Sequence, residues 1–139
     1  MARGGQEVNL DTVPAAAKEA VMSNDAPKAE ERISPDECRT MAEVRQGVDA
    51  LDRRIVALIG ERFRYMDAAA RIKPAREAVR DEGRKAQVIA NVERLADAAA
   101  FPPSVATRLY EGLVEASIAY ELDRFDAIRA DAESGRDEG

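Results

Sequence analysis

A long apolar period between residues 41 and 73 constrains the fold more than any other feature of this sequence. Thr40 and Glu43 have the spacing of a capping box, in which each side chain binds the other's backbone amide where a helix starts. Pro74 is typical of a helix end. Between them, apolar side chains recur mostly at three- and four-residue steps, at Met41, Val44, Val48, Leu51, Ile55, Leu58, Tyr65, Ala69 and Ile72. The pattern predicts one helix of about 33 residues, about 50 Å long.

A helix of this length predicts a second copy of the chain. The part of the chain that we expect to be ordered has about 105 residues, and a compact monomer of that size has a radius of gyration of about 13 Å. Two shorter helices of the same chain cannot cover an apolar face that follows most of such a helix. We therefore expect a two-fold homodimer in which the long helices cover each other.

Composition favours an all-α fold for the rest of the chain. Aromatic residues make up 4% of the sequence, Trp is absent and there are 8 Gly, which argues against a β-sandwich or barrel. Apolar spacing predicts two more helices, over residues 84–99 and 104–128, and a polar loop over residues 74–83. We expect a helical domain over residues 34–129, a mobile extension over residues 1–33 and a polar tail over residues 130–139.

Composition also excludes several kinds of chemistry. The chain has no His, and Cys38 is its single cysteine, so His-based catalysis, a disulfide framework and a Cys-based zinc site are all excluded. The net charge of −6 disfavours general binding to nucleic acid or to an anionic membrane. No apolar run approaches the ~20 residues of a membrane-spanning helix, and no segment near the start resembles a signal peptide. We expect a cytoplasmic protein that uses no metal and no cofactor.

Charged side chains at positions that should be apolar are the strongest functional clue. Arg62 falls in the apolar series 41, 48, 55, 62 and 69, and Lys73 lies about 20° from it around the same helix. Arg45 borders the same face. On the last helix, the series 105, 109 and 113 continues with Ser117 and Glu121. Each residue alone could reach solvent or pair with another, but together they leave a surplus of inward cations. Because buried cations need partners, we infer an anionic ligand with more than one carboxylate or phosphate.

The spacing of Arg45 and Lys73 indicates a site at a subunit interface. These residues are 28 positions apart in the sequence, and that separation is about 42 Å along one helix. They therefore cannot contact the same small molecule from one chain. Two long helices that run antiparallel in a dimer can bring them together, with Arg45 donated across the interface.

The segment from Cys38 to about Phe125 resembles the all-helical class of chorismate mutases and their relatives, the isochorismate pyruvate lyases. The resemblance rests on five motifs in the order and spacing of that family. They are Val44-Arg45 with residues 49–52, Arg62, Arg71-Ile72-Lys73, Asp81-Glu82-Gly83-Arg84, and Ser117 with Glu121. Such a resemblance implies an intertwined helical homodimer that converts chorismate into prephenate.

The resemblance also implies how the cations act. Arg45 of one subunit would bind one carboxylate of the substrate. Arg62, supported by Arg84, would bind the other carboxylate. Lys73 would donate to the ether oxygen, where negative charge grows as the carbon–oxygen bond breaks. A pericyclic rearrangement of this kind needs a clamped reactive conformer and a positive field, with no nucleophile or cofactor.

The remaining implied site residues are polar or acidic. Asp81 and Ser117 would lie near the substrate hydroxyl or a carboxylate, and Glu82 is the alternative to Asp81. Glu121 would donate to the ether oxygen from the other side, which a carboxyl group can do only when it is protonated. Many relatives have Gln at that position. Lys85 stands where some relatives have an acidic residue.

Two other functions also fit the sequence. The opening Pro35-Asp36-Glu37-Cys38 and the long polar loop look more like the lyase subfamily, which forms salicylate and pyruvate from isochorismate. Glu121 favours the mutase. A non-catalytic helical dimerisation module would require only apolar heptads and a charged surface, but it would give no reason for Arg62 or Glu121 on inward faces.

Overall fold

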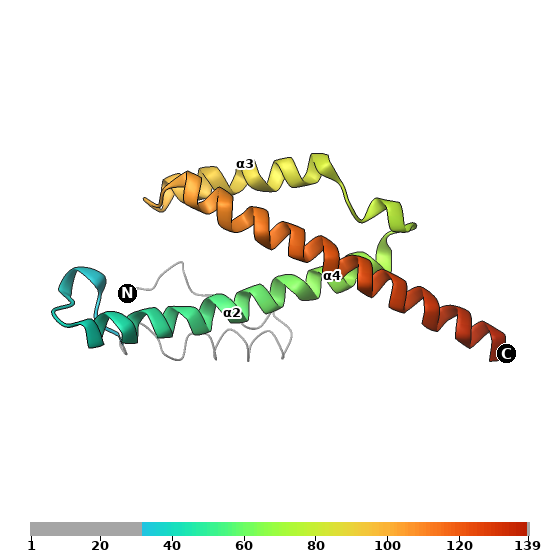
Figure 1. Ribbon diagram of the computed structural model, residues 1–139, viewed down its shortest axis with the longest axis horizontal. Coiled ribbons are helices and arrows are strands. Elements are labelled where there is room, and N and C mark those ends of the chain that lie inside the picture. Colours follow the sequence, from blue (N-terminus) through green and yellow to red (C-terminus); the bar gives the residue numbers. More distant parts are fainter. Residues whose placement is uncertain (1–31, 139) are drawn as a thin grey trace, which may run out of the picture. The chain divides into compact units, whose positions relative to one another are not determined.

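The computed structural model describes residues 32–138, and within this range the fold is all-α (Figure 1). Its elements are η4 (Pro35–Glu37), α2 (Met41–Ile72), η5 (Arg76–Ala78), α3 (Glu82–Ala98) and α4 (Pro103–Glu138), where η marks a short 3-10 helix. The predicted extension over residues 1–33 lies almost wholly outside the described residues. The chain divides into two compact units, with the boundary between Gly60 and Glu61.

Helix α2 begins and ends where its sequence predicts. The Glu43 backbone amide donates to Thr40 Oγ1 at 3.1 Å, and Glu43 Oε1 accepts from the Thr40 backbone amide at 3.2 Å. These two bonds are the expected capping box. At the other end, the backbone amide of Lys73 still donates to the carbonyl of Ala69 at 2.9 Å, and Pro74 follows directly. The helix has 32 residues, against the ~33 expected from its apolar period.

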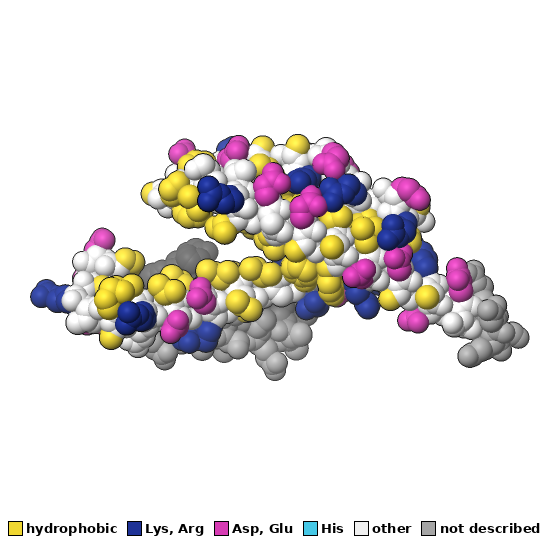
Figure 2. Space-filling view, in the orientation of Figure 1, with side chains coloured by type: hydrophobic (Ala, Val, Ile, Leu, Met, Phe, Trp, Pro, Cys, Tyr) yellow, Lys and Arg dark blue, Asp and Glu magenta, His cyan; other side chains and the backbone are white. Residues whose placement is uncertain are grey.

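The apolar face of α2 is exposed along much of its length (Figure 2). Its exposed large side chains include Met41, Val44, Val48, Leu51, Ile55, Leu58, Tyr65 and Ile72. Such a run of open apolar surface is rare in a monomer and is typical of surfaces that bind another molecule. No helix among the described residues combines the length and the hydropathy that crossing a membrane requires.

The connection between α2 and α3 is more structured than the predicted polar loop. It contains η5, and Val79 directly after it is only 3% exposed. Val79 belongs to a core cluster of the second unit that also contains Ala70, Val114, Ile118 and Phe125. The prediction of a polar loop over residues 74–83 therefore missed Val79, a buried apolar residue that packs this connection against α4.

Helix α3 starts slightly before its predicted position because Asp81 caps it. The Asp81 carboxylate accepts a hydrogen bond from the backbone amide of Arg84, as an N-cap residue does. The helix ends in a tight turn at Ala100, whose φ of 57° is left-handed, and the amide of Phe101 donates to the Ala96 carbonyl at 2.9 Å. Helix α4 then begins at Pro103 and folds back along α3.

The predicted end of the last helix, at residue 128, is wrong. Helix α4 continues to Glu138, through the segment that we expected to be a polar tail. Residues 129–134 are Arg, Ala, Asp, Ala, Glu and Ser, most of which support a helix through intrinsic propensity. Loss of the apolar period marks where a helix leaves the core, and in this segment no proline ends it.

Candidate active site

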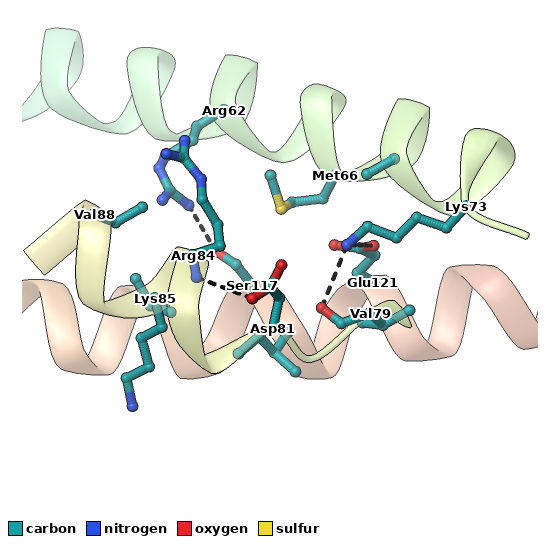
Figure 3. Close-up of a pocket in the computed structure, with 13 residues that line it drawn as sticks. Arg62, Met66, Lys73, Val79, Asp81, Arg84, Lys85, Val88, Ser117 and Glu121 are labelled. Atoms are coloured by element: carbon teal, nitrogen blue, oxygen red, sulfur yellow. Dashed lines mark hydrogen bonds and ion pairs between the residues drawn. The ribbon is translucent and has the colours of Figure 1, made fainter. Parts of the chain in front are cut away.

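A cavity of about 320 Å³ in the second unit gathers six of the seven predicted site residues (Figure 3). They come from the last turns of α2, the start of α3 and the middle of α4, namely Arg62, Lys73, Asp81, Arg84, Ser117 and Glu121. Met66, Ala69, Val79, Val88, Val114 and Ile118 supply apolar wall, and Lys85 also borders the cavity. A largely apolar cavity with a few convergent charged groups is typical of a small-molecule site.

Arg62 and Ser117 form one end of the cavity. Arg62 Nη1 donates to Ser117 Oγ at 2.8 Å, and its guanidinium carbon lies 5.7 Å from the centre of the Tyr110 ring. The Ser117 hydroxyl is buried and donates in turn to the Leu113 carbonyl at 2.7 Å. Because one bond to Ser117 uses one of five guanidinium N–H groups, Arg62 keeps donors for a carboxylate in the cavity.

Lys73 and Glu121 form the other end. Lys73 Nζ lies 2.8 Å from Glu121 Oε2 and donates to the backbone carbonyl of Val79 at 3.3 Å. The Glu121 side chain is only 5% exposed, against 29% for Lys73. Apart from this ion pair, Glu121 Oε2 receives no aligned hydrogen bond within the described range. Figure 3 shows the two side chains reaching toward each other from facing helices.

Asp81 and Arg84 lie where α3 begins. Asp81 lines the cavity, while its carboxylate also caps α3 through the Arg84 amide at 3.0 Å. Arg84 Nη1 donates to Gln87 Oε1 at 2.9 Å. Glu82, the alternative to Asp81, is absent from this cavity's wall and pairs with Arg80 at 2.9 Å. Of these two alternatives, Asp81 and not Glu82 therefore lies at the cavity, at the start of α3.

Arg45, the seventh predicted residue, belongs to the first unit. Its side chain is exposed on α2, four residues after the helix begins. The described residues of one chain thus supply six residues of the predicted set at one cavity, and Arg45 does not line that cavity.

Sequence analysis missed two residues that support Lys73. Val79 accepts from its ammonium, and Arg129 Nη2 donates to its backbone carbonyl at 2.7 Å. Signals for both were present in the sequence. Val79 is the largest apolar residue in an otherwise polar connection, and Arg129 continues the four-residue series of Ser117 and Glu121.

An ion-pair network next to the cavity ties the start of α3 to α4. Arg80 donates to Glu115 at 2.6 and 3.2 Å, and Lys85 Nζ lies 2.8 Å from Glu115 and 3.1 Å from Glu111. The Arg80 guanidinium, and after it the Lys85 ammonium, lower the pKa of Glu115 from 4.5 to about 2. In Figure 3 the Lys85 ammonium points away from the cavity. Lys85 therefore belongs to this network, and the positive charge inside the cavity comes from Arg62, Lys73 and Arg84.

Replacing Glu115 with Gln is expected to lower the melting temperature by a few degrees at pH 7. Since folding depresses the pKa of Glu115, its stabilisation is present above about pH 4.5 and disappears as pH falls toward 2. The difference between wild type and variant should therefore shrink over that interval in thermal unfolding followed by circular dichroism. Glu133→Gln, an exposed change on the same helix, is the control. A difference that stays constant from pH 7 to pH 3 would contradict this account.

Comparison with known proteins places these residues in a family. The family described as chorismate mutase type II matches residues 44–122, more than half of the chain. The chain belongs to the chorismate mutase type II family. The matched segment includes all seven predicted site residues, from Arg45 to Glu121, and it ends before Phe125 and Arg129.

One curated relative of this chain is named for a different reaction, that of an isochorismate pyruvate lyase. The isochorismate pyruvate lyase of Pseudomonas aeruginosa is 25% identical to this chain over 99 residues, which cover 71% of this chain and 98% of the relative. Resemblance to the chorismate mutases and to the lyases, expected from the motifs, is therefore confirmed at the level of the family.

Proposed function

We propose that this protein is a chorismate mutase that rearranges chorismate to prephenate. The observation that carries this proposal is the cavity, which has Arg62 and Ser117 at one end and Lys73 and Glu121 at the other. Family membership supports a substrate of the chorismate type. The reaction breaks one carbon–oxygen bond and forms one carbon–carbon bond within the same molecule, so no atom, proton or electron is exchanged.

The cations at the Arg62 end select a reactive shape of the substrate. Arg62, with Arg84 beside it in the cavity wall, binds one carboxylate in the planar geometry that guanidinium favours. Arg45 of a second copy binds the other carboxylate. Holding both carboxylates brings the side chain of the substrate over its ring, so much of the entropy cost of the compact conformer is met on binding.

Lys73 stabilises charge where the carbon–oxygen bond breaks. Its ammonium lies 2.8 Å from Glu121 Oε2 and donates to the Val79 carbonyl, so it needs little reorganisation when the reaction begins. A positive group fixed in advance beside a developing negative charge is among the largest contributions to catalysis. The apolar wall around it keeps the local dielectric low, which strengthens the interaction.

Glu121 lies beside the same ether oxygen in this proposal, where a hydrogen-bond donor stabilises the charge that develops and a carboxylate repels it. An amide of the same shape always donates, so Glu121→Gln should turn over chorismate at least as fast as wild type. Steady-state kinetics of the two proteins checks this expectation. A kcat more than about tenfold below wild type in folded Glu121→Gln would contradict this role.

A homodimer forms part of the proposal. The exposed apolar face of α2 needs a partner, and a second antiparallel copy covers it while donating Arg45. Mixing Arg45→Ala with Lys73→Ala should therefore regenerate activity that neither variant has alone. Each mixed dimer holds one site with both residues intact, so recovery should approach about one quarter of the wild-type rate after random exchange. No recovery after complete subunit exchange would show that Arg45 acts within its own chain or has no role.

Isochorismate pyruvate lyase activity is the second candidate, because the similarity to the Pseudomonas aeruginosa lyase spans nearly that enzyme's whole length. A paired assay decides between the reactions. It follows loss of chorismate absorbance and, separately, salicylate fluorescence from isochorismate. Faster turnover of chorismate is expected. Faster release of salicylate would assign the cavity to the lyase reaction, and no turnover of either substrate would favour the non-catalytic dimerisation module.

A further inference from the structure

Arg129 contacts the residue that the proposed mechanism depends on most. Its Nη2 atom donates to the backbone carbonyl of Lys73 at 2.7 Å in a partly buried bond. Its guanidinium carbon lies 3.9 Å from the centre of the Phe125 ring, and Phe125 is a core residue that is 6% exposed. The arginine is thus fixed both by stacking and by a charge-assisted hydrogen bond.

The carbonyl that Arg129 binds has no partner within its own helix. Lys73 follows the last residue of α2, where the final carbonyl groups point beyond the helix. Pro74 follows and restricts the backbone of Lys73 to extended conformations. The direction of that carbonyl and the starting direction of the Lys73 side chain are therefore set together, and Arg129 binds the carbonyl directly.

A second contact from α4 holds the chain just beyond Pro74. Arg76 donates to both carboxylate oxygens of Asp126, at 2.9 and 3.2 Å. Asp126 and Arg129 are three residues apart on α4, so one turn of this helix binds the chain both before Pro74 and after it. Of the two contacts, only the bond from Arg129 reaches Lys73 itself.

We propose that Arg129 is a positioning residue, which fixes the backbone of Lys73 so that its ammonium stays beside Glu121 and the reacting oxygen. This inference rests on the proposed function of the cavity and assigns a role to a residue outside the segment that matches the family. Arg129 does not line the cavity. It acts through Lys73, so in this proposal the segment after residue 128 contributes to catalysis through Arg129.

Three arginine variants separate this role from general stability. Arg129→Met keeps an apolar stem over Phe125 but removes the donor, and it should lower kcat about tenfold with KM changed less than about twofold. Arg129→Lys keeps a cationic donor and should recover most of kcat. Arg124→Met is the matched control on the same helix, because Arg124 makes an exposed ion pair with Asp67 and should leave kcat unchanged.

A double-mutant cycle tests whether Arg129 acts through Lys73. If it does, Arg129→Met should have no further effect on kcat in a Lys73→Ala background. An equal loss of kcat in both backgrounds would overturn the proposal, as would an Arg129→Met variant that keeps the wild-type kcat. If Lys73→Ala itself leaves turnover intact, the proposed function fails, and that result is distinct from a failure of the positioning role.

A spectroscopic measurement decides the positioning role without turnover. The side-chain ammonium signal of Lys73 in ¹⁵N NMR is identified by its loss in Lys73→Arg. It should shift or broaden in Arg129→Met, return toward its wild-type position in Arg129→Lys and stay in place in Arg124→Met. An unchanged Lys73 signal in folded Arg129→Met would overturn the proposal even if the protein turned over neither substrate.

Discussion

Replacing Lys73 with Ala is expected to lower kcat for chorismate about 10³-fold while KM changes little. In the proposed mechanism the ammonium lies where charge appears only during the reaction, so its removal should destabilise the transition state and hardly affect the bound substrate. The effect should exceed that of a neutral hydrogen-bond donor, because Lys73 carries a full charge in a mainly apolar cavity. Steady-state kinetics with chorismate measures both constants.

The Lys73 variant needs a control for folding. Removing the ammonium leaves Glu121 buried without its cation, which by itself destabilises the protein. Lys73→Met combined with Glu121→Gln removes both charges and should fold well, as judged by thermal unfolding, yet remain inactive. If that double variant or Lys73→Ala retained kcat within about tenfold of wild type, the cavity would not use the electrostatic mechanism proposed for it.

Replacing Arg62 with Ala should lower kcat/KM about 100-fold, mainly through a higher KM. Arg62 is expected to hold a substrate carboxylate before and during the reaction, and a charged hydrogen bond of this kind contributes up to about 3 kcal/mol. Its loss also frees the Ser117 hydroxyl from its 2.8 Å bond and removes the cation beside Tyr110. Loss of Arg62 is therefore expected to raise KM more than it lowers kcat, whereas loss of Lys73 lowers kcat and leaves KM nearly unchanged.

Arg62→Lys distinguishes charge from geometry at this end of the cavity. A lysine keeps the positive charge but loses the planar pair of donors that fits a carboxylate, so recovery should be partial. Kinetics of both variants, with the binding of prephenate measured by calorimetry, gives the comparison. A KM within twofold of wild type in Arg62→Ala would remove Arg62 from the substrate site.

The start and end of α2 could be predicted because they depend on local chemistry. Thr40 and Glu43 satisfy each other's amides, and Pro74 prevents continuation, so neither boundary needs information from elsewhere in the fold. The end of α4 could not be predicted in this way. Its last ten residues have no apolar period, and they remain helical through propensity and continuity with a long helix that is already formed.

The predicted site residues could be found because they interrupt apolar faces. Arg62, Ser117 and Glu121 occupy positions where an apolar side chain would otherwise stand, and the structure brings all three to one cavity. Arg129 and Val79 act through contacts between a backbone carbonyl and a distant side chain, which leave only a weak trace in the spacing of residue types. The role proposed for Arg45 requires a second chain, so the sequence indicates it through the length of α2 and the family motifs, and the fold of one chain does not test it.

A crystal structure with a dicarboxylate mimic of the chorismate transition state tests the central claim most directly. The account predicts the mimic in the cavity between α2, α3 and α4, with one carboxylate on Arg62 and its ether oxygen within hydrogen-bonding distance of Lys73 Nζ. It also predicts Arg45 of a second copy on the other carboxylate. A mimic bound elsewhere, or bound in the cavity with its ether oxygen turned away from Lys73, would contradict the account.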